Sequence, residues 1–96
     1  MKQYYVYIMS NKNNTVLYIG VTSNLKRRVC EHKEEIKPNS FTARYNCFCL
    51  VYFEEYREPG SAIKREKRLK KLKRSEKDIL IKNANPNMSD LYDTLF

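Results

Sequence analysis

Two segments of the sequence hold the side chains that could carry out chemistry. In the first segment, Arg28 and His32 are four residues apart, so they would share one face of a helix. An arginine can bind phosphate oxygens through two parallel hydrogen bonds, and a histidine can exchange a proton near neutral pH. This pair therefore indicates a site for a phosphate-like anion.

The second segment is a strongly basic predicted helix, residues 62–74, that contains one glutamate. Ile63, Leu69 and Leu72 form its apolar stripe. Glu66 is three residues from both Ile63 and Leu69, which places it on that stripe rather than on the basic face. A carboxylate on a buried face needs a cation, so Glu66 is a metal ligand, the partner of a nearby arginine, or a residue at the margin of the stripe.

Tyr7 and Tyr18, on predicted strands, complete a set that suits hydrolysis of a phosphodiester bond. Arginine offsets the charge that develops on the phosphate, and tyrosine or histidine holds or deprotonates the attacking water. A metal ion on a carboxylate polarises the phosphate and stabilises the leaving oxygen. Only one carboxylate, Glu66, is well placed, so the sequence favours a one-metal site over a two-metal site.

The hydrophobic pattern predicts the scaffold that positions these side chains. The predicted elements are strands 3–9 and 16–21, a helix 25–36, a strand 47–54, and helices 62–74, 75–85 and 89–95. Residues 41–46 are predicted to be irregular or briefly helical. The order ββαβααα predicts an α/β layered (α+β) domain, in which a small three-stranded antiparallel sheet is flanked by helices. No repeat or linker interrupts residues 1–96, which are therefore expected to form a single domain.

Local signals refine this scaffold. Period-two alternation places Val6 and Ile8 on one face of the first strand and Tyr7 on the other. Side-chain oxygens near Asn24, at Ser61 and in a capping box from Ser75 to Asp78 are predicted to begin the three longer helices.

The chain carries a large excess of positive charge. Nineteen Lys and Arg residues against eleven Asp and Glu give a formal net charge of +8 in 96 residues. This excess favours a polyanionic partner, nucleic acid before an anionic membrane surface; a solvated basic surface without a partner is the alternative. The sequence has no stretch of ~18 apolar residues and no signal-peptide pattern, so we expect no membrane span and a cytoplasmic location.

Three cysteines, Cys30, Cys47 and Cys49, are too few and too irregular to predict a disulfide framework. Cys30, His32, Cys47 and Cys49 could be assembled into a four-ligand zinc site, but their spacing matches no standard zinc pattern. We therefore expect ordinary core thiols.

Two tyrosine motifs, separated by ten residues, precede the first predicted helix: Tyr5-Val6-Tyr7 and Tyr18-Ile19-Gly20. Together with Arg28, His32 and Glu66 they resemble the GIY-YIG endonuclease superfamily. The resemblance extends over nearly the whole chain. It is strongest to small stand-alone bacterial members, which are related to the N-terminal nuclease module of the UvrABC incision subunit. The first motif departs from the pattern, because Tyr5 stands in place of Gly and Val6 in place of Ile.

The resemblance implies a role for each matching residue. Tyr7 and Tyr18 would be the motif tyrosines, one positioning or deprotonating the water and the other supporting it. Arg28 would contact the scissile phosphate, and His32 would carry a proton or form a hydrogen bond. Glu66 would be the single metal ligand, holding Mg²⁺ or Mn²⁺ with waters completing the shell.

Further residues would support this site. Gly20 is expected to allow close approach of the backbone, and the resemblance implies that Asn85 braces the site. Basic residues of two helices are the candidate nucleic-acid contacts: Lys26, Arg27, Lys64, Arg65, Lys67, Arg68, Lys70 and Lys71.

The sequence thus predicts a metal-dependent endonuclease that hydrolyses DNA, with structure-selective cutting and a role in DNA repair or processing implied by the resemblance. RNA is a further candidate substrate, and a protein partner or a homodimer is a candidate source of targeting. The alternative function is a non-catalytic nucleic-acid-binding module that retains the nuclease fold, since the basic helix and exposed tyrosines would serve it equally well. A membrane-surface binder is the third alternative.

Overall fold

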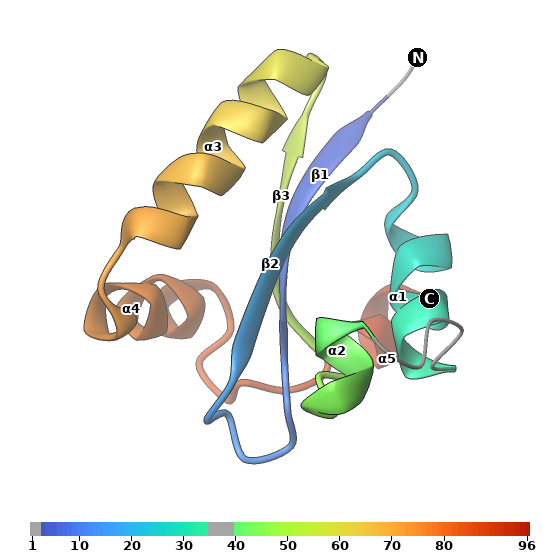
Figure 1. Ribbon diagram of the computed structural model, residues 1–96, viewed down its shortest axis with the longest axis vertical. Coiled ribbons are helices and arrows are strands. Elements are labelled where there is room, and N and C mark those ends of the chain that lie inside the picture. The colour runs from blue at the N-terminus through green and yellow to red at the C-terminus, as the bar shows by residue number, and fades with distance from the viewer. Residues whose placement is uncertain (1–2, 35–39) are drawn as a thin grey trace.

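A computed structural model describes residues 3–34 and 40–96 of the chain. Its elements, in order, are β1 (Tyr4–Ser10), β2 (Leu17–Thr22), α1 (Leu25–Lys33), α2 (Phe41–Arg44), β3 (Cys49–Tyr56), α3 (Pro59–Lys71), α4 (Arg74–Ala84) and α5 (Tyr92–Leu95). The strands form one antiparallel sheet in the order β2-β1-β3. Helices cover both faces, α3 and α4 on one side and α1, α2 and α5 on the other (Figure 1). The predicted fold class is confirmed.

The alternating pattern of β1 divides the interior into two cores. Val6 and Ile8 belong to the core under α3 and α4, which also contains Leu69 and Ile81. Tyr7 and Met9 belong to the core under α1, with partners that include Leu25, Val29 and Leu50. A strand directs successive side chains to opposite faces, so the predicted separation of the tyrosine row from the Val and Ile row is confirmed.

Helix α1 begins where its cap was predicted. The Oδ1 atom of Asn24 accepts a hydrogen bond from the Arg27 backbone N–H at 3.0 Å, and Thr22 Oγ1 accepts one from the Asn24 N–H at 3.1 Å. These bonds satisfy donors that a helix N-terminus leaves free. The predicted end of this helix, near residue 36, lies outside the described residues.

The third strand starts two residues later than predicted. Helix α2 ends in a tight turn, because Asn46 adopts a positive φ of 57° and the Cys47 N–H bonds back to the Thr42 carbonyl at 2.8 Å. This turn keeps Cys47 out of the sheet, and β3 runs instead from Cys49 to Tyr56.

The two basic-region helices also begin earlier than predicted. Helix α3 starts with Pro59 in its first turn, where a missing N–H costs nothing, so Ser61 is inside the helix and caps nothing. Helix α4 starts at Arg74, and Glu76 Oε1 accepts from the Lys73 N–H at 2.9 Å. The predicted capping box from Ser75 to Asp78 is therefore wrong, because the helix already begins at Arg74 and Glu76 accepts from the Lys73 N–H instead. The final helix is shorter than predicted, Tyr92–Leu95.

An arginine fastens the hairpin tip to the corner between α3 and α4. Arg74 Nη1 donates to the Thr15 carbonyl at 2.8 Å, and Nη2 donates to the Asn14 carbonyl. Its Nε donates to Asp78 Oδ1 at 3.0 Å. These bonds tie the turn between β1 and β2 to the other layer of the molecule.

Candidate active site

The β1–β2 hairpin places the two motif tyrosines beside each other. Tyr7 pairs with Gly20 and Met9 pairs with Tyr18 in the antiparallel register. The Tyr7 and Tyr18 rings have centroids 6.2 Å apart. A Cβ atom on Gly20 would lie 2.6 Å from the Tyr7 hydroxyl oxygen and 2.7 Å from Cζ, so the Tyr7 ring occupies the space that a side chain at position 20 would need.

His32 joins this pair through a chain of hydrogen bonds. The Tyr7 hydroxyl lies 2.9 Å from His32 Nε2, and His32 Nδ1 lies 2.8 Å from Thr42 Oγ1. Thr42 is itself 3.2 Å from Ser40 Oγ, at the cap of α2. Both imidazole nitrogens are therefore engaged within the protein, which fixes the ring orientation and leaves neither nitrogen open to a metal.

Arg28 completes the group from the preceding turn of α1. Its hydrogen bond with the Tyr7 hydroxyl raises the pKa of Arg28, although partial burial opposes this rise. Burial raises the pKa of Tyr7 to about 12 despite the opposing effect of the Arg28 guanidinium, so the phenol stays protonated at neutral pH. Arg28 Nη1 also lies 3.7 Å from Glu31.

One hydrogen-bond donor of Arg28 has no acceptor within the described structure. The Nε atom of Arg28 is buried and lacks a hydrogen-bond partner among the described residues. Buried donors without a partner are rare in folded proteins, because desolvation costs about 1–3 kcal/mol. A guanidinium held by Tyr7 with a spare N–H beside it is suited to receive an anionic oxygen.

Tyr18, a member of this group, lines a pocket at the β2 edge of the sheet. It has a volume of about 270 Å³ and is lined by Leu17, Tyr18, Ile19, Phe41, Lys70 and Lys77. Tyr18 is half-buried and contributes to this lining, whereas Tyr7 is completely buried behind it. The aromatic wall continues outward, with the Tyr18 and Phe41 rings 5.9 Å apart and the Phe41 and Tyr45 rings 4.7 Å apart.

Glu66 lies on the other layer, one helical turn from this pocket. Ala62, Glu66 and Leu69 follow one another at helical spacing on the sheet-facing side of α3, and Ala62 and Leu69 are fully buried. Ile63, predicted to belong to this stripe, is 45% exposed instead. The Glu66 carboxylate pairs with Lys70 at 3.6 Å, and Lys70 lines the pocket with Tyr18. The structure thus groups Tyr7, Tyr18, Arg28 and His32, and among the described residues Glu66 is related to them through Lys70, which lines the pocket with Tyr18.

The donor set around Glu66 fits a loosely held divalent cation. Within the described part of the chain, no group of three or more His, Cys, Asp or Glu side chains is placed to hold a metal ion. Mg²⁺ is commonly bound by one or two carboxylates while waters and substrate phosphates supply the other ligands. Glu66 is partly shielded, with 21% of its side chain exposed, and its partner Lys70 is more than half exposed and lies 3.6 Å away. One carboxylate of this kind fits an ion that binds together with the phosphate.

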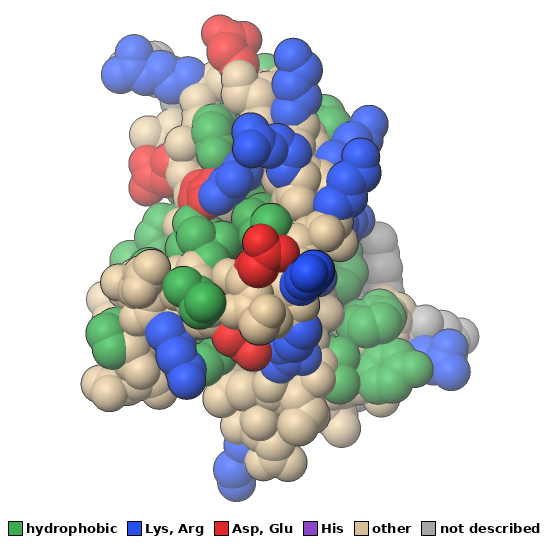
Figure 2. Space-filling model, turned by 90° about the vertical axis from the view of Figure 1, so that its left-hand side faces the viewer, with side chains coloured by type: hydrophobic (Ala, Val, Ile, Leu, Met, Phe, Trp, Pro, Cys, Tyr) green, Lys and Arg blue, Asp and Glu red, His purple; other side chains and the backbone are tan. Residues whose placement is uncertain are grey.

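The predicted basic residues fall on two separate surfaces. Lys26 and Arg27 are exposed on α1, while the larger set is on α3, on the opposite side of the sheet (Figure 1). Figure 2 faces the α3 and α4 side, where Lys and Arg side chains gather over the upper half. On α3, the exposed members are Lys64, Lys67, Arg68, Lys70 and Lys71.

Arg65 differs from the other basic residues of α3 because it binds a carboxylate of β3. Its Nε and Nη2 atoms donate to Glu54 at 2.9 and 3.0 Å, and the Tyr52 and Tyr56 hydroxyls donate to the same carboxylate. Burial alone would raise the pKa of Glu54, but the hydrogen bonds from Arg65 and the two tyrosines lower it. Arg65 therefore anchors α3 to the sheet, and its Nε and Nη2 donors are already bound to Glu54 rather than available to a phosphate.

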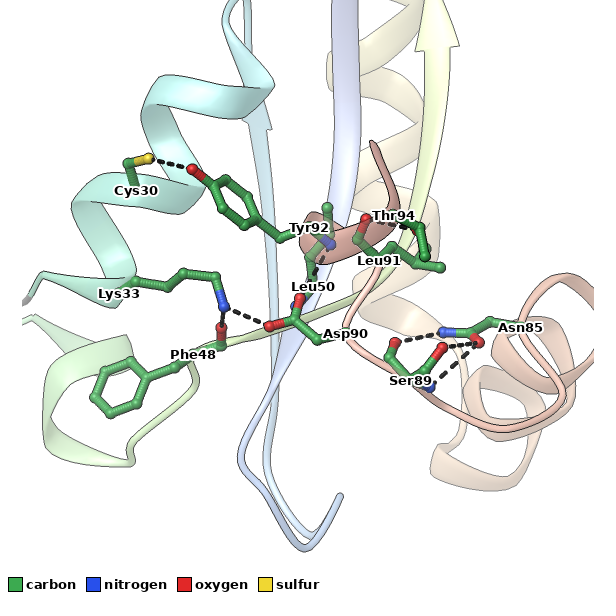
Figure 3. A network of polar contacts seen from close by, with 10 residues as sticks. All are labelled: Cys30, Lys33, Phe48, Leu50, Asn85, Ser89, Asp90, Leu91, Tyr92 and Thr94. Carbon is green, nitrogen blue, oxygen red and sulfur yellow. Dashed lines mark hydrogen bonds and ion pairs between the residues drawn. The ribbon is translucent and has the colours of Figure 1, made fainter. Parts of the chain in front are cut away.

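Asn85 braces a different part of the molecule from the Tyr7 group. Its Nδ2 donates to the Val51 carbonyl at 3.0 Å and to the Ser89 carbonyl at 2.8 Å, while its Oδ1 accepts from Ser89 (Figure 3). These bonds attach the C-terminal turn to β3, so any support for the site passes through the sheet.

Sequence reasoning missed two residues of the site, Thr42 and Phe41. Both belong to α2, a four-residue helix in a segment predicted to be irregular or briefly helical. The available signal was Ser40, whose hydroxyl accepts from the Ala43 N–H at 3.3 Å as a helix cap. A cap at residue 40 would have directed Thr42 inward, where it is buried.

Comparison with known proteins identifies the family and the fold. The model of the GIY-YIG catalytic domain matches residues 3–79. A UPF0213 protein of Desulfotalea psychrophila is 35% identical over 93% of this chain and 80% of its own length, and one of Syntrophus aciditrophicus is 36% identical over 90% and 97%. The solution structure of a UPF0213 protein from Bacillus halodurans superposes with a TM-score of 0.54 at 25% identity, covering 97% of this chain and 94% of its own.

No helix within the described residues is long and apolar enough to span a membrane.

The GIY-YIG domain indicates a nuclease family, for which nucleic acid is the general substrate. The chain is a member of the GIY-YIG family and is similar to its small UPF0213 proteins.

Proposed function

We propose that this protein is a metal-dependent endonuclease that hydrolyses phosphodiester bonds in DNA, acting in the cytoplasm in DNA repair or processing. The observation that carries the proposal is the group of Tyr7, His32 and Arg28, in which the buried Arg28 Nε lacks a hydrogen-bond partner among the described residues. Tyr18, whose ring lies beside that of Tyr7, lines a pocket with lysines on its wall. An anionic oxygen that enters this place gains a charge-assisted hydrogen bond and relieves the orphaned donor.

The residues of the site divide into those that meet the substrate and those that position them. Tyr18 lines the pocket and holds the attacking water, while Arg28 binds a phosphate oxygen and offsets the charge that develops in the transition state. Tyr7 is buried and protonated, so it positions Arg28 and His32 rather than acting as a base. Thr42 holds His32 in turn.

Glu66 and Lys70 form the other side of the site. A divalent cation on Glu66 would polarise the phosphate and stabilise the leaving oxygen. Lys70 and Lys77 place positive charge on the pocket wall, where they draw the DNA backbone in. The exposed lysines of α3 extend this attraction along the surface.

Plasmid nicking tests the proposal. Purified protein is incubated with supercoiled plasmid or single-stranded DNA in Mg²⁺, Mn²⁺ or EDTA. We expect metal-dependent cutting that falls by about 10²–10³-fold in Arg28→Ala, because removal of one transition-state donor typically has this effect. Glu66→Gln and Tyr18→Phe should also lose activity. Arg57→Ala and Glu58→Gln, which change exposed residues outside the site, are matched controls and should retain it.

The second candidate function is nucleic-acid binding without cleavage, favoured by the exposed aromatic pair Phe41 and Tyr45 beside the pocket. Their side chains are 45% and 46% exposed, and such rings stack on unpaired bases. If the wild-type protein binds DNA but cuts it with neither metal, the endonuclease proposal fails and this candidate replaces it. Binding should weaken by ~0.9 log units per log unit of salt for each duplex phosphate contacted.

A further inference from the structure

The C-terminal segment, residues 85–96, follows the part of the chain that the GIY-YIG model matches and packs against the site helix α1. Its central residue is Asp90. One carboxylate oxygen of Asp90 pairs with Lys33 Nζ, and the other accepts the backbone N–H groups of Leu50 and Tyr92, each at 3.1 Å. Asp90 thereby links α1, β3 and α5 at one point (Figure 3).

Additional contacts reinforce this link. Lys33 Nζ donates to the Phe48 carbonyl at 2.8 Å and lies 5.2 Å from the centroid of the Tyr92 ring. The Tyr92 hydroxyl lies 2.8 Å from Cys30 Sγ, and the Leu91 N–H donates to the Leu50 carbonyl at 2.8 Å. Leu91 and Tyr92 also pack on the core that contains Tyr7. The segment is therefore attached to the end of α1 by charge, hydrogen bonds and packing together.

Helix α1 uses two sides for two purposes. Arg28 and His32, four residues apart, face Tyr7, whereas Cys30 and Lys33, three residues apart, face the C-terminal segment (Figure 3). At 100° per residue, these pairs lie on nearly opposite sides of the helix axis, with the core residues Leu25 and Val29 between them. A rotation or shift of α1 away from the segment would thus move His32 relative to Tyr7.

We propose that Asp90 is a positioning residue of the site, which acts through Lys33 to hold α1 so that His32 and Arg28 meet Tyr7. Lys33 is the neighbour of His32 and the last residue of α1, where a helix has no further turn to restrain it. The effect on catalysis rests on the proposed endonuclease function. The effect on His32 does not.

Nuclear magnetic resonance measures the effect of Asp90 on His32 directly. The chain contains one histidine, so its Hε1 signal belongs to His32 alone. In Asp90→Asn the amide oxygen can still accept from Leu50 and Tyr92, but the charge that holds Lys33 is lost. We expect a changed Hε1 shift and a changed titration midpoint for His32, with the residues of the sheet away from Leu50 unperturbed. Asp90→Ala should change both more strongly, and Lys33→Arg should keep the wild-type values.

Asp78→Asn is the matched control, because it breaks the ion pair with Arg74 on α4, on the far side of the sheet from α1. It should leave the His32 signal unchanged. For the enzyme, Asp90→Asn should lower kcat by about 10- to 100-fold, as expected for misplaced catalytic groups, while the Kd for DNA changes less than twofold.

Unchanged His32 shifts and titration in both Asp90 variants would overturn the proposal, whatever their activity. An equal effect of Asp78→Asn would overturn it too, because the change would then be a general loss of stability. If the wild-type protein lacks nuclease activity, the endonuclease function fails, and the His32 measurement still decides whether Asp90 positions α1.

Discussion

The two faces of the sheet are formed by alternate residues of the same strand, but they bury different kinds of side chain. On the α3 and α4 face, Val6 and Ile8 pack against apolar side chains that include Leu69. On the α1 face, Tyr7 is equally buried, yet its hydroxyl must bond to Arg28 and His32. The first face combines apolar burial with the Arg65–Glu54 network that anchors α3, whereas the second holds the polar groups of the candidate site, whose partners must all be in place. Stability and chemistry should therefore respond to different substitutions.

The largest effect on stability should come from Leu69→Ala on the apolar face. Leu69 is fully buried, and removal of such a side chain typically costs about 2–5 kcal/mol of unfolding free energy. Urea denaturation followed by circular dichroism measures this cost. Ile79→Ala, at a residue that is 61% exposed on α4, is the control and should change the free energy by less than about 0.5 kcal/mol. Equal effects of the two substitutions would contradict the burial of Leu69 in the core of this face.

Gly20→Ala should damage the polar face more than its small size suggests. The new methyl group would lie 2.6 Å from the Tyr7 hydroxyl, so the ring must move, at a cost of about 1–3 kcal/mol. Displacement of Tyr7 should also reduce DNA cleavage. Gly60→Ala is a matched control, since its new Cβ meets nothing within 4 Å and alanine favours the helix by roughly 0.5–1 kcal/mol. A Gly20→Ala protein with wild-type stability and activity would contradict the site geometry.

A third predicted effect is alkaline destabilisation, to which both faces contribute. Burial raises the pKa of Tyr7 to about 12, and burial with the Glu54 hydrogen bond raises the pKa of Tyr52 to about 12. An unfolded tyrosine releases its proton near pH 10, so stability is complete below pH 10 and decreases as the pH rises toward 12. Thermal denaturation across this range should show a smaller decrease in Tyr7→Phe and in Tyr52→Phe. A change in only one variant would assign the effect to one face.

The predictable part of the molecule is the part that local pattern determines. Alternation in β1 and β2 placed the tyrosines opposite the apolar row, and helical spacing placed Arg28 with His32. The predicted element boundaries were wrong where two nearby residues could each begin a helix. Helix α3, for example, begins at Pro59 and is not capped by Ser61.

Contacts between distant segments left no periodic signal in the sequence. Thr42 meets His32 across the residues between α1 and α2, and Asp90 meets Lys33 from the far end of the chain. Such pairs depend on how the helices pack on the sheet, and a short stretch of sequence carries no information about that packing. The resemblance predicted that Glu66 is a metal ligand, and helix spacing independently placed Glu66 on the apolar stripe.

The arginine that fastens the hairpin tip has a consequence for how the surface can recognise DNA. The guanidinium groups of Arg74 and Arg65 donate hydrogen bonds to carbonyls and carboxylates of the protein. The positively charged side chains that remain exposed on α3 and on the pocket wall are therefore mainly lysines. A lysine ammonium is a flexible point charge that follows phosphates without the planar, paired geometry by which arginine identifies guanine. For the proposed DNA substrate, we therefore expect this surface to bind the phosphate backbone with little preference for base sequence.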